Sequence, residues 1–418
     1  TRRCSTTTYG INRGGQMKRL DDYQEIVGDE VIFRIHHKMS KLYGKHIVHV
    51  NSTYQGGGVA EMLSSLIPLM NDIGLDTGWR ILHGNPDFFG VTKKFHNALQ
   101  GDPLHFTHIK RDLYINNNED FSQFTHLDHD ACIIHDPQPL PLIRFYKKTQ
   151  PWIWRCHIDL TDPDQRLWNF LKSFILRYDV VIVSNEKYIR KDLPVKQVII
   201  SPAIDPLSPK NKPLTEYTIQ KTMKKFRIPL NKPIITQISR FDKWKDPEGV
   251  INIYREVRKA IDCRLVLCGS MASDDPEGYK IYSKILKKNA DLIKKRDLIL
   301  VTTENSILVN ALQRQANIII QKSTREGFGL TVTEALWKGK PVIASNIGGI
   351  PLQIKDGESG FLIDPHDKKG AIEKIISLLE NPEMGKEMGE KGKEYVRNNF
   401  LIVRLLENYL DLLSEVIR

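Results

Sequence analysis

Short apolar runs alternate with longer stretches of helical periodicity along most of the chain. Several runs are apolar at successive positions, which is typical of strands buried on both faces of a parallel sheet. Helical patterns at Val59–Ile73, Phe88–Leu99 and Arg166–Arg177 separate strands of the first half. The strands predicted there are Ile47–Val50, Gly78–Leu82, Ala131–His135, Trp152–Cys156, Val180–Ser184 and Gln197–Ile200.

A second series of strands and helices begins after Pro233. Its predicted strands are Ile234–Ile238, Arg264–Cys268, Leu298–Val301, Ile318–Gln321 and Pro341–Ala344. Residues 202–233 between the two series contain six prolines, which favours a linker there. We therefore expect an α/β protein with two Rossmann-like, doubly wound parallel-sheet domains that face a cleft.

The expected N-terminal domain spans residues 1–205 and the C-terminal domain residues 214–397, with a hinge at 206–213. Helical patterns also close the chain, and we expect the last one, Leu401–Ile417, to pack back on the N-terminal domain. A length of 418 residues agrees with two domains, since one hydrophobic core rarely grows so large.

Composition points to an ordinary soluble protein. No apolar run reaches the 18 residues of a membrane-spanning helix. Residues 1–16 lack an apolar stretch, which argues against a secretory signal and favours a disordered tail. The five cysteines are odd in number and lack zinc-type spacing, so we expect reduced, mostly buried thiols and a cytoplasmic location.

The net charge of +11 raises the question of an anionic partner. Lysine and arginine are scattered among acidic residues and form no single basic stripe, so we do not expect nucleic-acid binding. A small anion such as a diphosphate fits a basic protein equally well.

The densest chemical signal is Arg325–Ala335, which follows the predicted strand Ile318–Gln321. Gly327 and Gly329 let the backbone approach a ligand, and the N–H groups of the following helix can bind an anion. Glu326 and Glu334 could then reach one crevice. A strand-to-helix turn with two solvent-facing carboxylates is the alternative.

Two further loops follow predicted strands. Arg240 and Lys245 come after Ile234–Ile238, where ligands of open α/β sheets bind, although both could be surface cations beside a helix that starts at Asp246. Gly56–Gly58 comes after the first strand and could approach a phosphate or sugar. That loop is neither a Walker loop nor a dinucleotide fingerprint, and a flexible turn remains open.

Together these motifs resemble the retaining glycosyltransferases of family 4, which have the two-domain GT-B fold. The resemblance rests on Glu326 and Glu334, which are separated by seven intervening residues, on the Arg240–Lys245 pair and on the glycine loop. It extends through Lys340–Ala344, Gly348–Pro351 and Asp356–Leu362 and covers nearly everything from residue 45 onward.

Finer motifs of the first half are similar to those of the archaeal and bacterial trehalose-forming members. These motifs are Asn51–Thr53, Gly56–Glu61, Phe95–Gly101, His135–Pro139 and Trp154–Asp159. The resemblance implies transfer of glucose from a nucleoside-diphosphate glucose to free glucose, with retention and release of the nucleoside diphosphate. Another family 4 hexosyltransferase with a sucrose-type, glycan or lipid-linked acceptor, or a non-catalytic sugar-nucleotide binder, is the alternative.

The resemblance also implies the roles of individual residues. Catalysis is expected to involve His157, Arg240, Lys245 and Glu326. The donor is expected to contact Gly57, Gly58, Arg240, Lys245, Glu326, Gly327, Phe328, Gly329, Leu330, Thr331 and Glu334. The acceptor is expected to contact Asp136, Gln138 and Asp159, although strand-end capping or turn roles are open for both aspartates.

No tightly bound cofactor or catalytic metal is expected. Asp128-His129-Asp130 has the Asp-x-Asp form of a metal motif, but it precedes a strand and is better read as a turn. Mg²⁺ could still stimulate by pairing with the free diphosphate. The expected partners are a sugar nucleotide and glucose, with no nucleic acid and no membrane, and a homodimer is left open.

Overall fold

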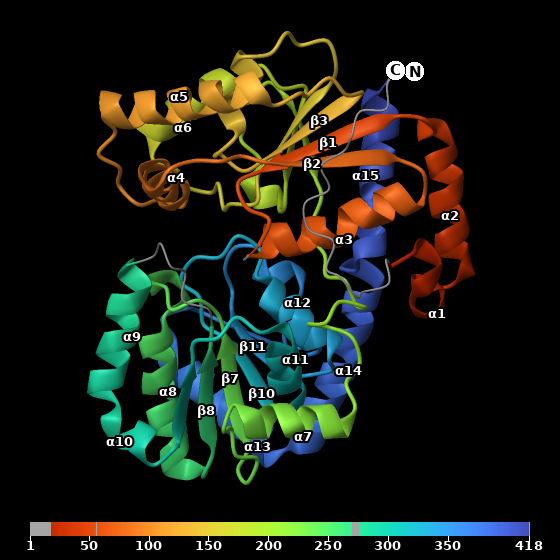
Figure 1. The fold of residues 1–418 in the computed structure, drawn as a ribbon. Helices are drawn as coiled ribbons and strands as arrows, with labels where there is room; N and C mark the ends of the chain where they lie inside the picture. The colour runs from red at the N-terminus through yellow and green to blue at the C-terminus, as the bar shows by residue number, and fades with distance from the viewer. Residues whose placement is uncertain (1–17, 56, 270–275, 418) are drawn as a thin grey trace.

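The structure is a computed structural model that describes residues 18–55, 57–269 and 276–417. The predicted N-terminal tail and Cys4 lie outside these residues. Two parallel six-stranded sheets form the framework, which confirms the predicted α/β class (Figure 1).

The first sheet has the strand order β2-β1-β3-β4-β5-β6 and is parallel throughout. Its β3 and β4 are buried at every position, as successive apolar residues require in a two-sided sheet. The strands are β1 (His46–Asn51), β2 (Asp76–Ile81), β3 (Ala131–His135), β4 (Trp152–Arg155), β5 (Val180–Val183) and β6 (Lys196–Ile199).

Helices cover both faces of the first sheet. One face packs against α2 (Asp29–Met39), α3 (Gly58–Asp72) and α15 (Ile402–Val416). The other packs against α4 (Pro86–Leu99), α5 (His108–Phe124) and α6 (Gln165–Ile175).

The second sheet has the order β12-β11-β10-β7-β8-β9, and its strands are likewise parallel. They are β7 (Ile234–Ile238), β8 (Arg264–Cys268), β9 (Leu298–Val301), β10 (Ile318–Gln321), β11 (Val342–Ser345) and β12 (Phe361–Ile363). One face packs against α7 (Glu216–Lys225), α11 (Ser306–Gln315), α12 (Leu330–Trp337) and α14 (Pro382–Asn399). The other packs against α8 (Pro247–Ala260), α9 (Pro276–Lys288), α10 (Ala290–Lys294) and α13 (Lys368–Glu380).

The C-terminal chain crosses from the second unit to the first. Helix α14 packs on α12, whereas α15 packs on α2 and α3 (Figure 1). The crossing is held by backbone hydrogen bonds from the Ile204 N–H to the Phe400 carbonyl, 2.9 Å, and from the Ile402 N–H to the Ile204 carbonyl, 2.8 Å. The last helix begins at Ile402, one residue later than predicted, because Leu401 is extended and pairs with Ile204.

Several smaller predictions can be checked directly. Cys132, Cys156, Cys263 and Cys268 are free and buried, as predicted. Asp246 caps α8 through a bond from the Gly249 N–H, with Pro247 at the first helical position. Within the described part of the chain, no helix is both long enough and apolar enough to cross a membrane.

Candidate functional site

The loops after β7 and β10 bring a cation and a carboxylate into contact. Lys245 closes a short 3₁₀ turn, Lys243–Lys245, and its Nζ lies 2.6 Å from Oε2 of Glu326. The Ser323 hydroxyl donates to the same carboxylate oxygen at 3.1 Å. Glu326 is buried, so Lys245 supplies the opposite charge that a desolvated carboxylate needs.

Arg240 lies in the same loop and is the more accessible of the two predicted cations. Its side chain is 44% exposed and its Nη2 lies 3.5 Å from Oδ2 of Asp242. Asp242 is itself fixed by accepting from the Trp244 N–H at 2.8 Å. Asp242 therefore orients the Arg240 guanidinium, whose other N–H donors remain available to a ligand.

Helix α4 of the first unit contributes two residues that the sequence did not assign. Lys93 Nζ lies 4.0 Å from Oδ2 of Asp242. Burial, followed by the charges of Lys93 and Arg240, lowers the pKa of His96 to about 3, so His96 is neutral at physiological pH. His96 belongs to the Phe95–Gly101 motif, but nothing in that motif shows that it meets cations of the second unit.

Glu334 lies inside α12, as predicted, and is 3% exposed. Its Oε1 lies 3.6 Å from Nζ of Lys210, and its Oε2 is buried without a hydrogen-bond partner among the described residues. Burial raises the pKa of Glu334, and the Lys210 charge opposes that rise.

Lys210 connects three parts of the chain. Its Nζ also lies 2.5 Å from Oε1 of Glu61 on α3. Although burial acts to lower it, the carboxylates of Glu334 and Glu61 raise the pKa of Lys210, so this lysine stays charged. Lys210 and Glu61 are further residues beside the predicted site, and their pairing depends on a tertiary contact that no local motif shows.

The N-termini of α3 and α12 approach each other where the two units meet (Figure 1). A Cβ at Gly58, the first residue of α3, would lie 2.8 Å from Cδ1 of Leu330, the first residue of α12. Gly57 and Gly329 precede these helices with φ of +84°, a conformation that favours glycine. Two helix starts, each with free N–H groups, therefore lie close together, which suits an anion with two phosphates.

The loop after β4 closes on the loop that carries Glu326. A Cβ at Gly327 would lie 2.5 Å from the His157 carbonyl oxygen, so only glycine permits this approach. The Tyr188 hydroxyl donates to the Gly327 carbonyl at 2.7 Å, and Asn185 Nδ2 donates to the Gly348 carbonyl at 2.9 Å. Residues of both units therefore surround the loop that carries Glu326.

Two of the residues predicted for the acceptor, Asp136 and Asp159, accept hydrogen bonds from backbone N–H groups. Asp136 has φ of +62°, and its Oδ1 accepts from the His157 backbone N–H at 2.8 Å. Oδ1 of Asp159 accepts from the Thr161 N–H at 2.8 Å, which forms a turn. Oε1 of Gln138 is buried without a partner among the described residues. Asp159 therefore has the turn role that the sequence left open, and Asp136 has the strand-end capping role, in which it positions the His157 backbone.

Residues 49–190 match the family model of the trehalose synthase N-terminal domain, and residues 218–395 match that of the glycosyl transferases group 1. Over 410 residues the chain is 49% identical to the trehalose synthase of Thermococcus litoralis, covering 96% of this chain and 98% of that protein. The chain belongs to the trehalose synthase family. It is a glycosyltransferase, and the predicted family resemblance is confirmed.

Solved structures support the same architecture. A trehalose-6-phosphate synthase, OtsA, superposes with a TM-score of 0.73 at 14% identity, covering 89% of this chain and 99% of that one. The sucrose-phosphate synthase of Thermosynechococcus elongatus superposes with a TM-score of 0.69 at 18% identity, covering 88% and 98%. At such low identity these two matches establish the GT-B fold alone.

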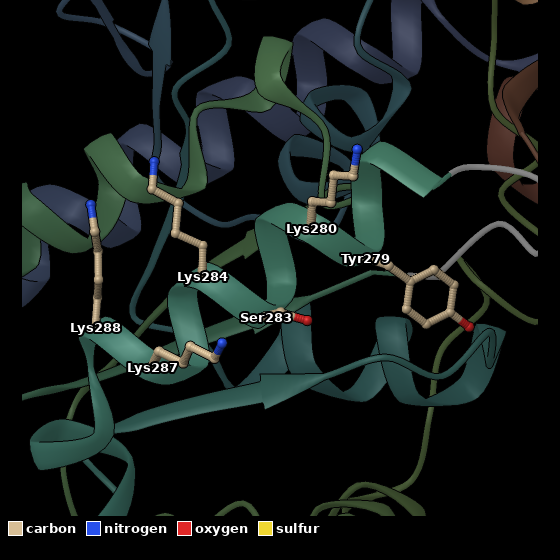
Figure 2. Close-up of a pocket in the computed structure, with 6 residues that line it drawn as sticks. All are labelled: Tyr279, Lys280, Ser283, Lys284, Lys287 and Lys288. Carbon is tan, nitrogen blue, oxygen red and sulfur yellow. The ribbon is translucent and has the colours of Figure 1, made fainter.

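A hollow beside α9 lies apart from this junction (Figures 1 and 2). Among the residues that the structure describes, its lining comes from one helix, and no second element brings converging groups to it. Two of its lysines are already paired, since Lys284 and Lys288 lie 2.6 and 3.2 Å from the carboxylate of Glu248. The lining residues are Tyr279, Lys280, Ser283, Lys284, Lys287 and Lys288. We assign no donor or acceptor role to this hollow.

Proposed function

We propose that this glycosyltransferase makes trehalose from a nucleoside-diphosphate glucose and free glucose and releases the nucleoside diphosphate. The observation that carries this proposal is the Lys245–Glu326 pair beside Arg240, at the place where α3 and α12 begin. The glucose C1–O bond to the diphosphate breaks while a C1–O bond to the acceptor forms on the same face. The acceptor proton leaves on a phosphate oxygen of the departing diphosphate.

The charge that develops on the leaving diphosphate is matched by fixed groups. Arg240, Lys245 and the N–H groups from Phe328 to Thr331 would hold the phosphates, and such preorganised donors stabilise a developing anion. Glu326 would accept from hydroxyls of the transferred sugar. Oε2 of Glu334, which has no partner among the described residues, would accept from the ribose. His157 would lie beside the reacting carbon, with its carbonyl oxygen near Gly327.

The first unit would bind the acceptor and the second the donor, with residues 206–213 as the hinge. No resident metal enters this proposal, and Mg²⁺ would act on the released diphosphate. The enzyme would work in the cytoplasm, and a homodimer is compatible with it. Transfer to a sucrose-type, glycan or lipid-linked acceptor is the alternative. Identifying which acceptor the enzyme uses distinguishes the two functions.

The test is incubation with ADP-, UDP- or GDP-glucose and a panel of acceptors, with products identified by NMR. We expect a disaccharide with free glucose and none with fructose, a glycan or a lipid-linked sugar. Matched reactions with Glu326→Gln control for contaminating activity. Efficient transfer to another acceptor, with free glucose ignored, would overturn the proposed product.

A further inference from the structure

Three histidines form a continuous hydrogen-bonded row from the interior of the first unit to the candidate site. Nδ1 of His49 on β1 lies 2.9 Å from Nε2 of His135 on β3. Nδ1 of His135 lies 3.0 Å from Nε2 of His157. The rings are stacked, with centroids 5.2 and 5.3 Å apart. His157 is the end of this row that reaches the site.

These imidazoles are neutral at physiological pH. Burial, followed by the charge of Arg155, lowers the pKa of His49 to about 3. Burial is also the main reason why the pKa values of His135 and His157 lie well below the usual range. A neutral imidazole has one N–H and one lone pair, so each ring can donate from one nitrogen only.

Because His135 is the middle ring, the hydrogen bonds His49–His135 and His135–His157 must both donate in the same direction along the row. His135 uses both nitrogens, and if it donates to one neighbour it must accept from the other. Two states exist: all three rings carry the proton on Nδ1, or all three carry it on Nε2. The proton position at His157 is thus fixed by whatever decides the proton position at His49.

The surroundings of His49 favour the first state. Nε2 of His49 is buried and has no hydrogen-bond partner among the described residues. Tyr409 of α15 lies edge-on to His49, with ring centroids 5.8 Å apart, and Cζ of Arg155 lies 5.8 Å from the same Tyr409 ring. Arg155 is fully buried, and none of its side-chain nitrogens has a hydrogen-bond partner among the described residues.

A guanidinium only donates, and its positive charge repels a further N–H dipole. A lone pair on Nε2 of His49 is therefore favoured over a proton in this environment. The proton then lies on Nδ1 of His49, and by the same rule on Nδ1 of His135 and of His157.

We propose that His49 and His135, biased by Arg155, are positioning residues that hold His157 in the tautomer protonated on Nδ1. His157 then offers an N–H donor to a sugar hydroxyl instead of a lone pair. The row also fixes the ring plane, while Asp136 holds the backbone of the same residue. The part that concerns sugar binding rests on the proposed function, whereas the proton positions do not.

The test is an NMR measurement on the full chain labelled with ¹⁵N-histidine, without substrate. Couplings between ring nitrogens and ring-carbon protons distinguish a protonated from an unprotonated nitrogen. We expect His49, His135 and His157 all to be protonated on Nδ1 between pH 6 and 8. Protonation on Nε2 in this row, or a charged imidazolium, would overturn the proposal.

Variants test the direction of the effect. Arg155→Met should add the Nε2-protonated form at His157, and His135→Phe should mix both forms there. The exposed His366→Ala serves as the matched control and should change nothing in the row. An unchanged His157 in every folded variant of the row would contradict transmission along it.

Kinetics separate positioning from stability. His135→Phe should lower kcat about tenfold or more while changing the donor KM less, and His135→Gln, which keeps a donor and an acceptor, should recover part of the loss. An equal loss of kcat in both variants would indicate that His135 contributes only through packing. If the three Nδ1 protons are found but no sugar is transferred, the proposed function fails and the row stands.

Discussion

Lys245 and Glu326 are the residues on which the candidate site depends most, and their pairing is a contact between two loops. The sequence predicts that each follows a buried strand, and the topology explains why they meet, since β7 and β10 are neighbours in the second sheet. The sequence therefore predicted that both residues belong to one site, but it did not predict the ion pair between them. The contributions of Lys93, His96 and Lys210 were not predicted either, because each depends on how the two units face each other.

Lys245→Ala tests the cation at the leaving group. We expect kcat/KM to fall about 100- to 1,000-fold, because removing one preorganised donor to a developing anion has an effect of this size. Steady-state kinetics with the sugar nucleotide measure it. Lys284→Ala, which removes a paired lysine on α9, is the control and should retain activity.

Glu326 and Glu334 should separate kinetically. Glu334 would bind the ribose equally in the ground and transition states, so Glu334→Gln should raise the donor KM about tenfold and leave kcat nearly unchanged. Glu326 lies beside Lys245, so Glu326→Gln should mainly lower kcat. Calorimetry with free nucleoside diphosphate should show a larger loss of binding for Glu334→Gln. The opposite order would reverse the two assignments.

Asp136 gives a prediction about pH and stability. Burial raises the pKa of Asp136 to about 7, above its value of about 4 in an unfolded chain. Its contribution to the free energy of unfolding is thus fully present below pH 4 and is lost as the pH rises to 7. Asn tolerates the positive φ and keeps an oxygen for the His157 N–H.

The free energy of unfolding of Asp136→Asn should therefore rise relative to that of the parent protein between pH 4 and 7. The expected difference is about 2–4 kcal/mol, since a shift of one pKa unit corresponds to about 1.4 kcal/mol. Urea unfolding at several pH values measures the difference. A difference that does not change with pH would show that this carboxyl ionises normally in the folded protein.

At the scale of elements, the strands were largely predictable, whereas β12, α5 and α7 were not. Short β-rich runs revealed eleven strands, but β12 has three residues, too few for a pattern. Helix α5 was missed because its run Asn116-Asn117-Asn118 obscures the apolar stripe, and Tyr114 and Asn118 are its buried residues. Turn chemistry was more reliable, as the Asp246 cap of α8 shows.

The approach of two loops is the element-scale feature most open to test. Gly327→Ala would place a Cβ 2.5 Å from the backbone oxygen of His157, so the loops after β4 and β10 must separate. We expect at least a tenfold loss of kcat with little loss of nucleoside-diphosphate binding. Gly90→Ala, in open space on α4, is the control. Normal turnover in Gly327→Ala would show that catalysis does not need this contact.

At the scale of the whole molecule, two sheets and a crossing C-terminal helix bring distant residues to one junction. Lys243 lies 2.8 Å from Asp102, and Lys210 lies 2.5 Å from Glu61 and 3.6 Å from Glu334, so ion pairs connect the two units directly and through the hinge. The two-domain class was predictable from alternating strands and helices. The mutual placement of the domains was not, because it depends on side chains far apart in the sequence.

The measurement that tests the central claim most directly follows one labelled carbon. Nucleoside-diphosphate glucose labelled with ¹³C at C1 is incubated with unlabelled glucose, and the product is examined by NMR. The account predicts α,α-trehalose with the label at one anomeric carbon in the α configuration, and one nucleoside diphosphate released per trehalose. A β-configured labelled carbon, or labelled free glucose without a disaccharide, would contradict it.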